Sequence, residues 1–163
     1  MKTVVYPGTF NPITNGHTDL VKRAARIFDH VIVAIGSNTQ KSTDVSMDMR
    51  VRLATEVLAD LPNVEVCRFN GLLTSFVKSR GANLILRGLR TVADFEYEFQ
   101  LVGMNRVLEP GIETVFLAPA EHLAYISSTL VREIATYGGD ISQFVDPIVA
   151  EAMEDMLKNG KDK

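Results

Sequence analysis

The chain has a single cysteine, Cys67, and no apolar run that approaches the ~20 residues needed to span a bilayer. A lone cysteine excludes an intrachain disulfide. The formal net charge of −3 argues against a surface that recruits nucleic acid, so any basic site must be a local cluster. A short strand, rather than a signal-peptide apolar region, is expected directly after Lys2. We therefore expect a cytoplasmic protein that binds neither nucleic acid nor a membrane.

No linker, internal repeat or low-complexity segment divides the chain, so we expect one domain over residues 1–163. Short apolar runs alternate with helical patterns. The expected strands are Thr3–Tyr6, Val31–Gly36, Val64–Phe69, Leu84–Arg87 and Thr114–Ala118. The expected helices are Asn15–Phe28, Ser46–Leu58, Thr74–Arg80, Val92–Leu108 and Ser128–Tyr137, with a C-terminal helix at about 146–158. This alternation predicts an α/β fold: a Rossmann-like, doubly wound, five-stranded parallel sheet with helices on both faces.

The first strand is followed by a loop and a helix start that read Tyr6-Pro7-Gly8-Thr9-Phe10-Asn11-Pro12-Ile13-Thr14-Asn15-Gly16-His17. The loop lacks G-x-G-x-x-G and G-x-x-x-x-G-K-[ST], which excludes a dinucleotide fingerprint and a P-loop. In α/β proteins this position holds phosphates on exposed amides and the positive end of the helix dipole. Thr9 and His17 are spaced to converge on one anion there. The alternative is that Thr14 only caps the helix and His17 is a capping or surface residue.

Two further segments carry cations at the carboxyl ends of predicted strands, where open parallel sheets bind ligands. Lys41 lies in the polar loop after the second strand. Arg87 and Arg90 flank Gly88 at the end of the fourth, and arginine recognises phosphate through several planar donors. The alternative for the arginines is surface ion pairing. Glu98, in the helix that follows, suits either a nucleotide contact or a salt bridge.

The last polar cluster is Ile126-Ser127-Ser128-Thr129, followed by Arg132, at the start of a helix. Its hydroxyls suit capping of the helix, and they also suit wrapping of a polyphosphate together with exposed amides. Arg132, one turn after Ser128, strengthens the second interpretation. Neither a Ser-His-Asp or Cys-His set nor clustered Cys/His metal ligands are evident, so the sequence predicts neither covalent catalysis nor a dedicated metal cage.

Taken in order, these motifs resemble the nucleotidylyltransferase superfamily, and within it the bacterial phosphopantetheine adenylyltransferases. The resemblance rests on Tyr6–Phe10, Thr14–His17, Leu86–Arg90, Ala93–Glu98 and Ile126–Thr129. It implies transfer of the adenylyl group of ATP to 4′-phosphopantetheine, giving dephospho-coenzyme A and pyrophosphate. It also implies Mg²⁺ dependence, a homohexamer built as a dimer of trimers, and feedback inhibition by coenzyme A. This chain has Asn11 where that family usually has Asp, and Leu123 where an aromatic side chain is frequent nearby.

The resemblance also implies roles for individual residues. His17, Lys41 and Arg90 would be catalytic, with His17 stabilising the transition state. Thr9, Lys41, Leu73 and Arg87 would bind phosphopantetheine. The residues that would bind ATP are Thr9, Phe10, His17, Gly88, Leu89, Arg90, Glu98, Leu123, Ala124, Tyr125, Ile126, Ser127, Ser128 and Thr129.

Two alternatives remain open at this stage. One is a nucleotidylyltransferase that uses nicotinate mononucleotide or glycerol 3-phosphate as acceptor. The other is a non-catalytic module that binds adenine nucleotides.

Overall fold

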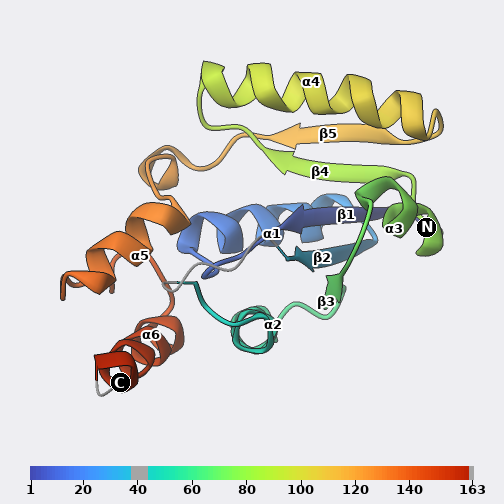
Figure 1. Cartoon of the computed structure of the whole chain (residues 1–163). Helices are drawn as coiled ribbons and strands as arrows, with labels where there is room; N and C mark the ends of the chain where they lie inside the picture. The colour runs from blue at the N-terminus through green and yellow to red at the C-terminus, as the bar shows by residue number, and fades with distance from the viewer. Residues whose placement is uncertain (38–43, 162–163) are drawn as a thin grey trace.

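A computed structural model describes residues 1–37 and 44–161 of the chain (Figure 1). Strands and helices alternate along most of it. The strands are β1 (Thr3–Gly8), β2 (His30–Gly36), β3 (Val64–Phe69), β4 (Leu84–Gly88) and β5 (Glu113–Leu117). The α-helices are α1 (Asn15–Ile27), α2 (Met47–Val57), α3 (Leu73–Ser79), α4 (Val92–Leu108), α5 (Ser128–Thr136) and α6 (Pro147–Lys161). A short 3₁₀ helix, Glu121–Leu123, precedes α5.

The five strands form one parallel sheet in the order β3-β2-β1-β4-β5. The α/β class predicted from the alternation of elements is therefore confirmed. β1 pairs with β2 along its whole length, from Thr3↔His30 to Gly8↔Ile35. Its pairing with β4 covers only Val4↔Leu84 and Val5↔Ile85. The two strands thus separate toward their carboxyl ends, at the point where the strand order reverses, which is where such sheets bind ligands.

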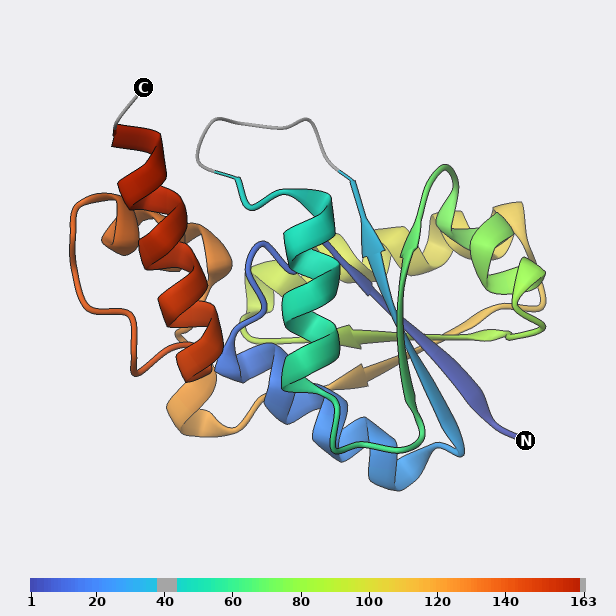
Figure 2. The ribbon, with the colours of Figure 1, turned by 90° about the horizontal axis from the view of Figure 1, so that it is seen from below.

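Helices cover both faces of the sheet (Figure 2). One core joins inward residues such as Val4, Val33 and Leu86 to α1, α2, α5 and α6. A smaller core on the other face joins Val5 and Ile32 to Val77 of α3. Helix α4 lies along β5 on that second face (Figure 1). Among the described residues, no helix combines the length and the apolar character needed to cross a membrane.

Most elements match their predicted bounds to within one or two residues, but α6 continues to Lys161, past its predicted end near residue 158, and β1 extends beyond Tyr6. Pro7 and Gly8 were expected to end the first strand, but β1 continues through both. Pro7 is tolerated because it lies beyond the two residues of β1 that pair with β4. Its carbonyl instead accepts a hydrogen bond from the Arg87 side chain. The 3₁₀ helix before α5 was not predicted, because three residues carry no usable periodicity.

Candidate active site

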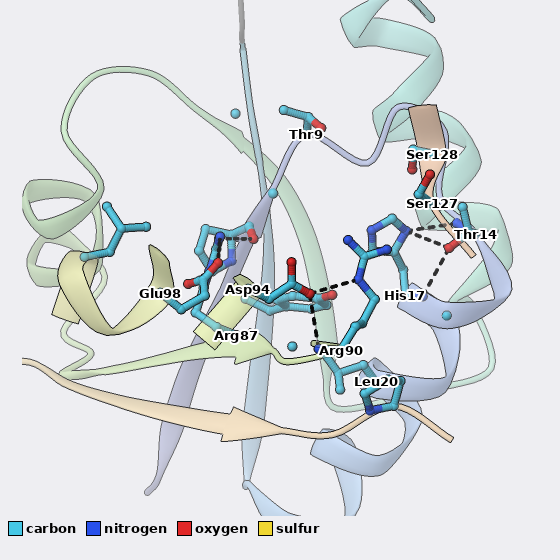
Figure 3. Close-up of a pocket in the computed structure, with 18 of the residues that line it drawn as sticks. Thr9, Thr14, His17, Leu20, Arg87, Arg90, Asp94, Glu98, Ser127 and Ser128 are labelled. Atoms are coloured by element: carbon cyan, nitrogen blue, oxygen red, sulfur yellow. Dashed lines mark hydrogen bonds and ion pairs between the residues drawn. The ribbon is translucent and has the colours of Figure 1, made fainter. Parts of the chain in front are cut away.

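A cavity of about 680 Å³ opens where β1 and β4 separate (Figure 3). This is well within the range of small-molecule sites. Its walls come from the carboxyl ends of β1 to β4, from the amino ends of α1 and α5, and from one face of α4. Both helix amino ends direct a partial positive charge toward this region, so the cavity is suited to an anionic ligand.

His17 is held at the first turn of α1 by a reciprocal cap with Thr14. The Thr14 hydroxyl accepts from the His17 backbone N–H at 3.4 Å. The Thr14 backbone N–H donates to His17 Nδ1 at 3.0 Å, and the Thr14 hydroxyl lies 3.1 Å from the same nitrogen. Because Nδ1 acts as an acceptor, the neutral imidazole carries its proton on Nε2. Burial, and then the charge of Arg90, lower the pKa of His17 to about 4.

Aromatic rings support the imidazole from one side. The Phe10 ring centroid lies 4.8 Å from that of His17 and 5.2 Å from that of Tyr6, which it meets edge-on. Phe10 itself is 1% exposed and has a positive φ of 45°. A Cβ at Gly8 would come within 2.9 Å of this ring, so glycine is required there for the ring to pack. Phe10 therefore supports His17 from the core and does not line the cavity.

Arg87 forms a bidentate ion pair with Glu98 of α4, and both residues line the cavity. Its Nε and Nη2 donate to the two carboxylate oxygens at 2.7 and 2.6 Å, and its Nη1 donates to the Pro7 carbonyl at 3.3 Å. Burial by itself would lower the pKa of Arg87, but the hydrogen bonds and charge of Glu98 outweigh it and raise the pKa. Arg87 is thus a fixed cation in the gap between β1 and β4.

Arg90 is held in a similar way by Asp94, one turn into α4. The Asp94 carboxylate accepts from the Arg90 backbone N–H at 3.2 Å and lies 3.4 Å from its Nε. Arg90 Nη1 donates to the Ile126 carbonyl at 2.8 Å, which joins the end of β4 to the segment before α5. In Figure 3, Arg90 extends from the end of β4 toward His17.

The start of α5 is docked onto the loop after β1. Ser127 caps the helix by accepting from the Leu130 backbone N–H. Ser128 Oγ donates to the Pro12 carbonyl at 2.8 Å, and Arg132 Nη1 donates to the Asn11 carbonyl at 2.5 Å. The hydroxyl cluster therefore contributes to capping and docking and also forms one wall of the cavity.

The structure brings most of the predicted site residues together. Those that line the cavity are Thr9, His17, Leu73, Arg87, Gly88, Arg90, Glu98, Leu123, Ile126, Ser127, Ser128 and Thr129. Four predicted ATP contacts do not line it: Phe10, Leu89, Ala124 and Tyr125. Tyr125 is 65% exposed and packs edge-on against Phe144. Lys41 lies outside the described residues.

Two features of the site escaped the sequence interpretation. Asp94 pairs with Arg90, and the spacing of the two by four residues could have suggested this pairing. Asn11, 6% exposed, accepts from the Val45 backbone N–H at 2.8 Å through its side-chain oxygen. An amide oxygen satisfies that contact without burying a charge, so Asn11 has a structural role in this chain.

The chain belongs to the cytidylyltransferase-like family, whose model matches residues 5–134, and it is therefore a nucleotidyltransferase. It is 58% identical over 154 residues to the phosphopantetheine adenylyltransferase of Hahella chejuensis (strain KCTC 2396), covering 94% of this chain and 96% of that protein. Within the class, it is thus a member of the phosphopantetheine adenylyltransferases.

Solved structures share the fold at lower identity. A protein from Vibrio parahaemolyticus described as a nicotinate-nucleotide adenylyltransferase matches with a TM-score of 0.69 at 20% identity, covering 94% of this chain and 99% of that one. A bifunctional NMN adenylyltransferase/ADP ribose pyrophosphatase from Francisella tularensis, complexed with AMP and a manganese ion, matches with a TM-score of 0.70 at 18% identity. The match covers 96% of this chain and 49% of that one.

Proposed function

We propose that the cavity transfers the adenylyl group of ATP to 4′-phosphopantetheine, giving dephospho-coenzyme A and pyrophosphate, the penultimate step of coenzyme A synthesis. The observation that carries this proposal is the 58% identity over nearly the whole chain to a phosphopantetheine adenylyltransferase. The geometry supports it, since two helix amino ends, two fixed arginines and a neutral histidine donor surround one cavity.

The reaction proceeds by direct in-line attack and needs no nucleophile from the protein. The phosphate of phosphopantetheine attacks the α-phosphorus of ATP, the new P–O bond forms, and pyrophosphate leaves with the electrons of the broken bond. Catalysis then consists of positioning two anions and stabilising charge on the transferring and leaving groups. Arg90 and the proton on His17 Nε2 supply that charge stabilisation. Thr9, Gly88, Leu123 and residues 126–129, which line the cavity, hold the remainder of ATP.

The acceptor lies on the side of Arg87. Arg87 and Lys41 offset the repulsion between its phosphate and the triphosphate, with Thr9 between the two anions. Leu73, which lines the same cavity, packs against the pantetheine arm.

Mg²⁺ is carried by the triphosphate. The described residues contain no group of three or more His, Cys, Asp or Glu side chains placed to hold a metal ion, whereas phosphate oxygens and water suit Mg²⁺ well. The Francisella relative is complexed with a manganese ion together with AMP, which agrees with a divalent ion brought by the nucleotide.

A homohexamer built as a dimer of trimers is the assembly we propose. Helix α4 supports an assembly of copies, because its exposed large hydrophobic residues include Phe99, Met104 and Val107, at 63%, 59% and 82% exposure. Coenzyme A carries both an adenine nucleotide and a pantetheine arm, so it is proposed to inhibit by filling both halves of the cavity. A cytoplasmic location also remains a prediction, testable by cell fractionation.

A pyrophosphate-release assay with ATP and a panel of acceptors tests the function. We expect release with 4′-phosphopantetheine and none with pantetheine, which lacks both the nucleophile and its anchor. Release with nicotinate mononucleotide or glycerol 3-phosphate instead would favour the rival acceptors. ATP binding without release for any acceptor would favour a non-catalytic nucleotide module.

A further inference from the structure

A cavity built for phosphates contains two carboxylates, which calls for a physical explanation. Asp94 and Glu98 both line the cavity, and both come from α4. A carboxylate facing bound phosphates repels them unless a cation neutralises it. In α4 the one buried residue is Glu98, whose side chain is 9% exposed, although many of the apolar side chains of this helix are exposed.

The two carboxylates are four residues apart and therefore lie on one face of α4. Each is paired with a different arginine at the end of β4: Glu98 with Arg87 and Asp94 with Arg90. The helix thus presents one carboxylate to each of the two arginines. Each carboxylate is neutralised by its arginine and does not repel a bound anion.

The pairing leaves each arginine able to bind a phosphate. A guanidinium has five N–H donors. Glu98 takes two of those on Arg87 and the Pro7 carbonyl takes a third. Within the described part of the chain, the remaining two donors of Arg87 have no protein partner, so a planar edge stays available to an anion. Fixing a flexible side chain in this way reduces the entropy lost on binding.

We propose that Asp94 and Glu98 are positioning residues that divide the two substrates between them. Glu98 fixes Arg87 and so governs the acceptor phosphate, whereas Asp94 fixes Arg90 and so governs the phosphates of ATP. This inference rests on the proposed function. It also gives Glu98 a role on the acceptor side, in place of the nucleotide contact that the family resemblance implies.

The test compares Glu98→Gln with Asp94→Asn in the pyrophosphate-release assay, with ATP affinity measured by calorimetry. Glu98→Gln should raise the KM for phosphopantetheine at least about tenfold while the Kd for ATP stays within about threefold of the parent. Glu98→Ala, which removes both acceptor oxygens, should shift the acceptor KM further in the same direction. Asp94→Asn should lower kcat at least about tenfold and leave the acceptor KM within about threefold.

Glu96→Gln is the matched control, since Glu96 is exposed on the same helix and the change removes the same charge. It should behave as the parent does. Retained ATP binding shows that each variant is folded, so a variant that loses ATP and acceptor binding together indicates a structural role and overturns the inference. Glu98→Gln acting mainly on ATP would restore the nucleotide contact and also overturn it. Absence of turnover in the parent protein would overturn the proposed function itself.

Discussion

The Thr14 backbone N–H donates to Nδ1 of His17 at 3.0 Å, so the helix cap and the candidate catalytic imidazole are parts of the same contact. The cap fixes the ring and its tautomer together, which leaves the proton on Nε2. A neutral donor of this kind can stabilise the negative charge that develops on a phosphate, and it does not repel the nearby cation Arg90.

Replacing His17 with alanine should therefore reduce turnover far more than ATP binding. We expect His17→Ala to fold, to bind ATP within about tenfold of the parent and to lose at least about a hundredfold in kcat, as for other transition-state donors. Steady-state kinetics and calorimetry measure the two effects. His30→Ala is the control, because His30 lies at the opposite end of the sheet, where β2 begins. If His17→Ala kept near-parental turnover, His17 would be a capping residue without a catalytic role.

The pH dependence of stability should show the low pKa of His17. An unfolded histidine takes up a proton near pH 6.5, whereas burial delays this in the folded protein to about pH 4. Between these values the unfolded state binds more protons, so the contribution of His17 to stability falls as the pH falls. Thermal unfolding of the parent and of His17→Gln should show the parent losing stability relative to the variant from pH 6.5 down to pH 4. A difference that does not vary with pH would contradict the burial of this imidazole.

Arg50 should contribute to stability and not to chemistry. It is 2% exposed, and its guanidinium donates to the carbonyls of Val45, Thr9 and Gly36 at 2.7, 3.4 and 3.5 Å. Arg50→Leu removes the side-chain donor of all three carbonyls and should lower the free energy of unfolding by about 2–4 kcal/mol. Arg52→Leu, at an exposed position on the same helix, should change it by no more than about 0.5 kcal/mol. Chemical denaturation measures both, and equal effects would refute the role of Arg50.

The exposed apolar side of α4 should hold copies of the chain together. Light scattering of the purified protein should give a mass near six times 18.0 kDa. Phe99→Glu should reduce that mass, because it places a charge on a side chain that is 63% exposed in the single chain. Ile27→Glu, a matched change on α1 at 58% exposure, should leave the mass unchanged. A monomeric parent at micromolar concentration would contradict the proposed assembly.

Local patterns in the sequence predicted the sheet and its helices, and they placed Thr9, His17, Arg87 and Arg90 near one another at the cavity. They succeeded because alternating apolar runs and strand-to-helix loops are short-range features. The sequence left Thr14 and His17 open between capping and catalysis, and the structure explains why, since His17 caps the helix while lining the cavity. The sequence could not show whether Arg87 pairs with Glu98 or contacts a phosphate, because the ion pair depends on how α4 packs against β4.

Arg50 illustrates a second limit of the sequence. Its spacing places it on the helix face of Leu53 and Ala54, unlike exposed Arg52, but no local pattern shows that its guanidinium contacts the carbonyls of Thr9, Gly36 and Val45. A charged side chain can be buried where backbone carbonyls need hydrogen-bond donors. The positions of such carbonyls are known only from the assembled fold.

The short pairing between β1 and β4 also makes this seam the mechanically weakest line in the sheet. Two registered residue pairs join the β3-β2-β1 half to the β4-β5 half, against six pairs between β1 and β2. A small rotation about Val4 and Val5 would widen or narrow the mouth of the cavity while both halves stay rigid. Amide hydrogen exchange along Tyr6 and Gly8 should slow when ATP bridges the two halves, and exchange unaffected by ATP would show that the seam is already closed.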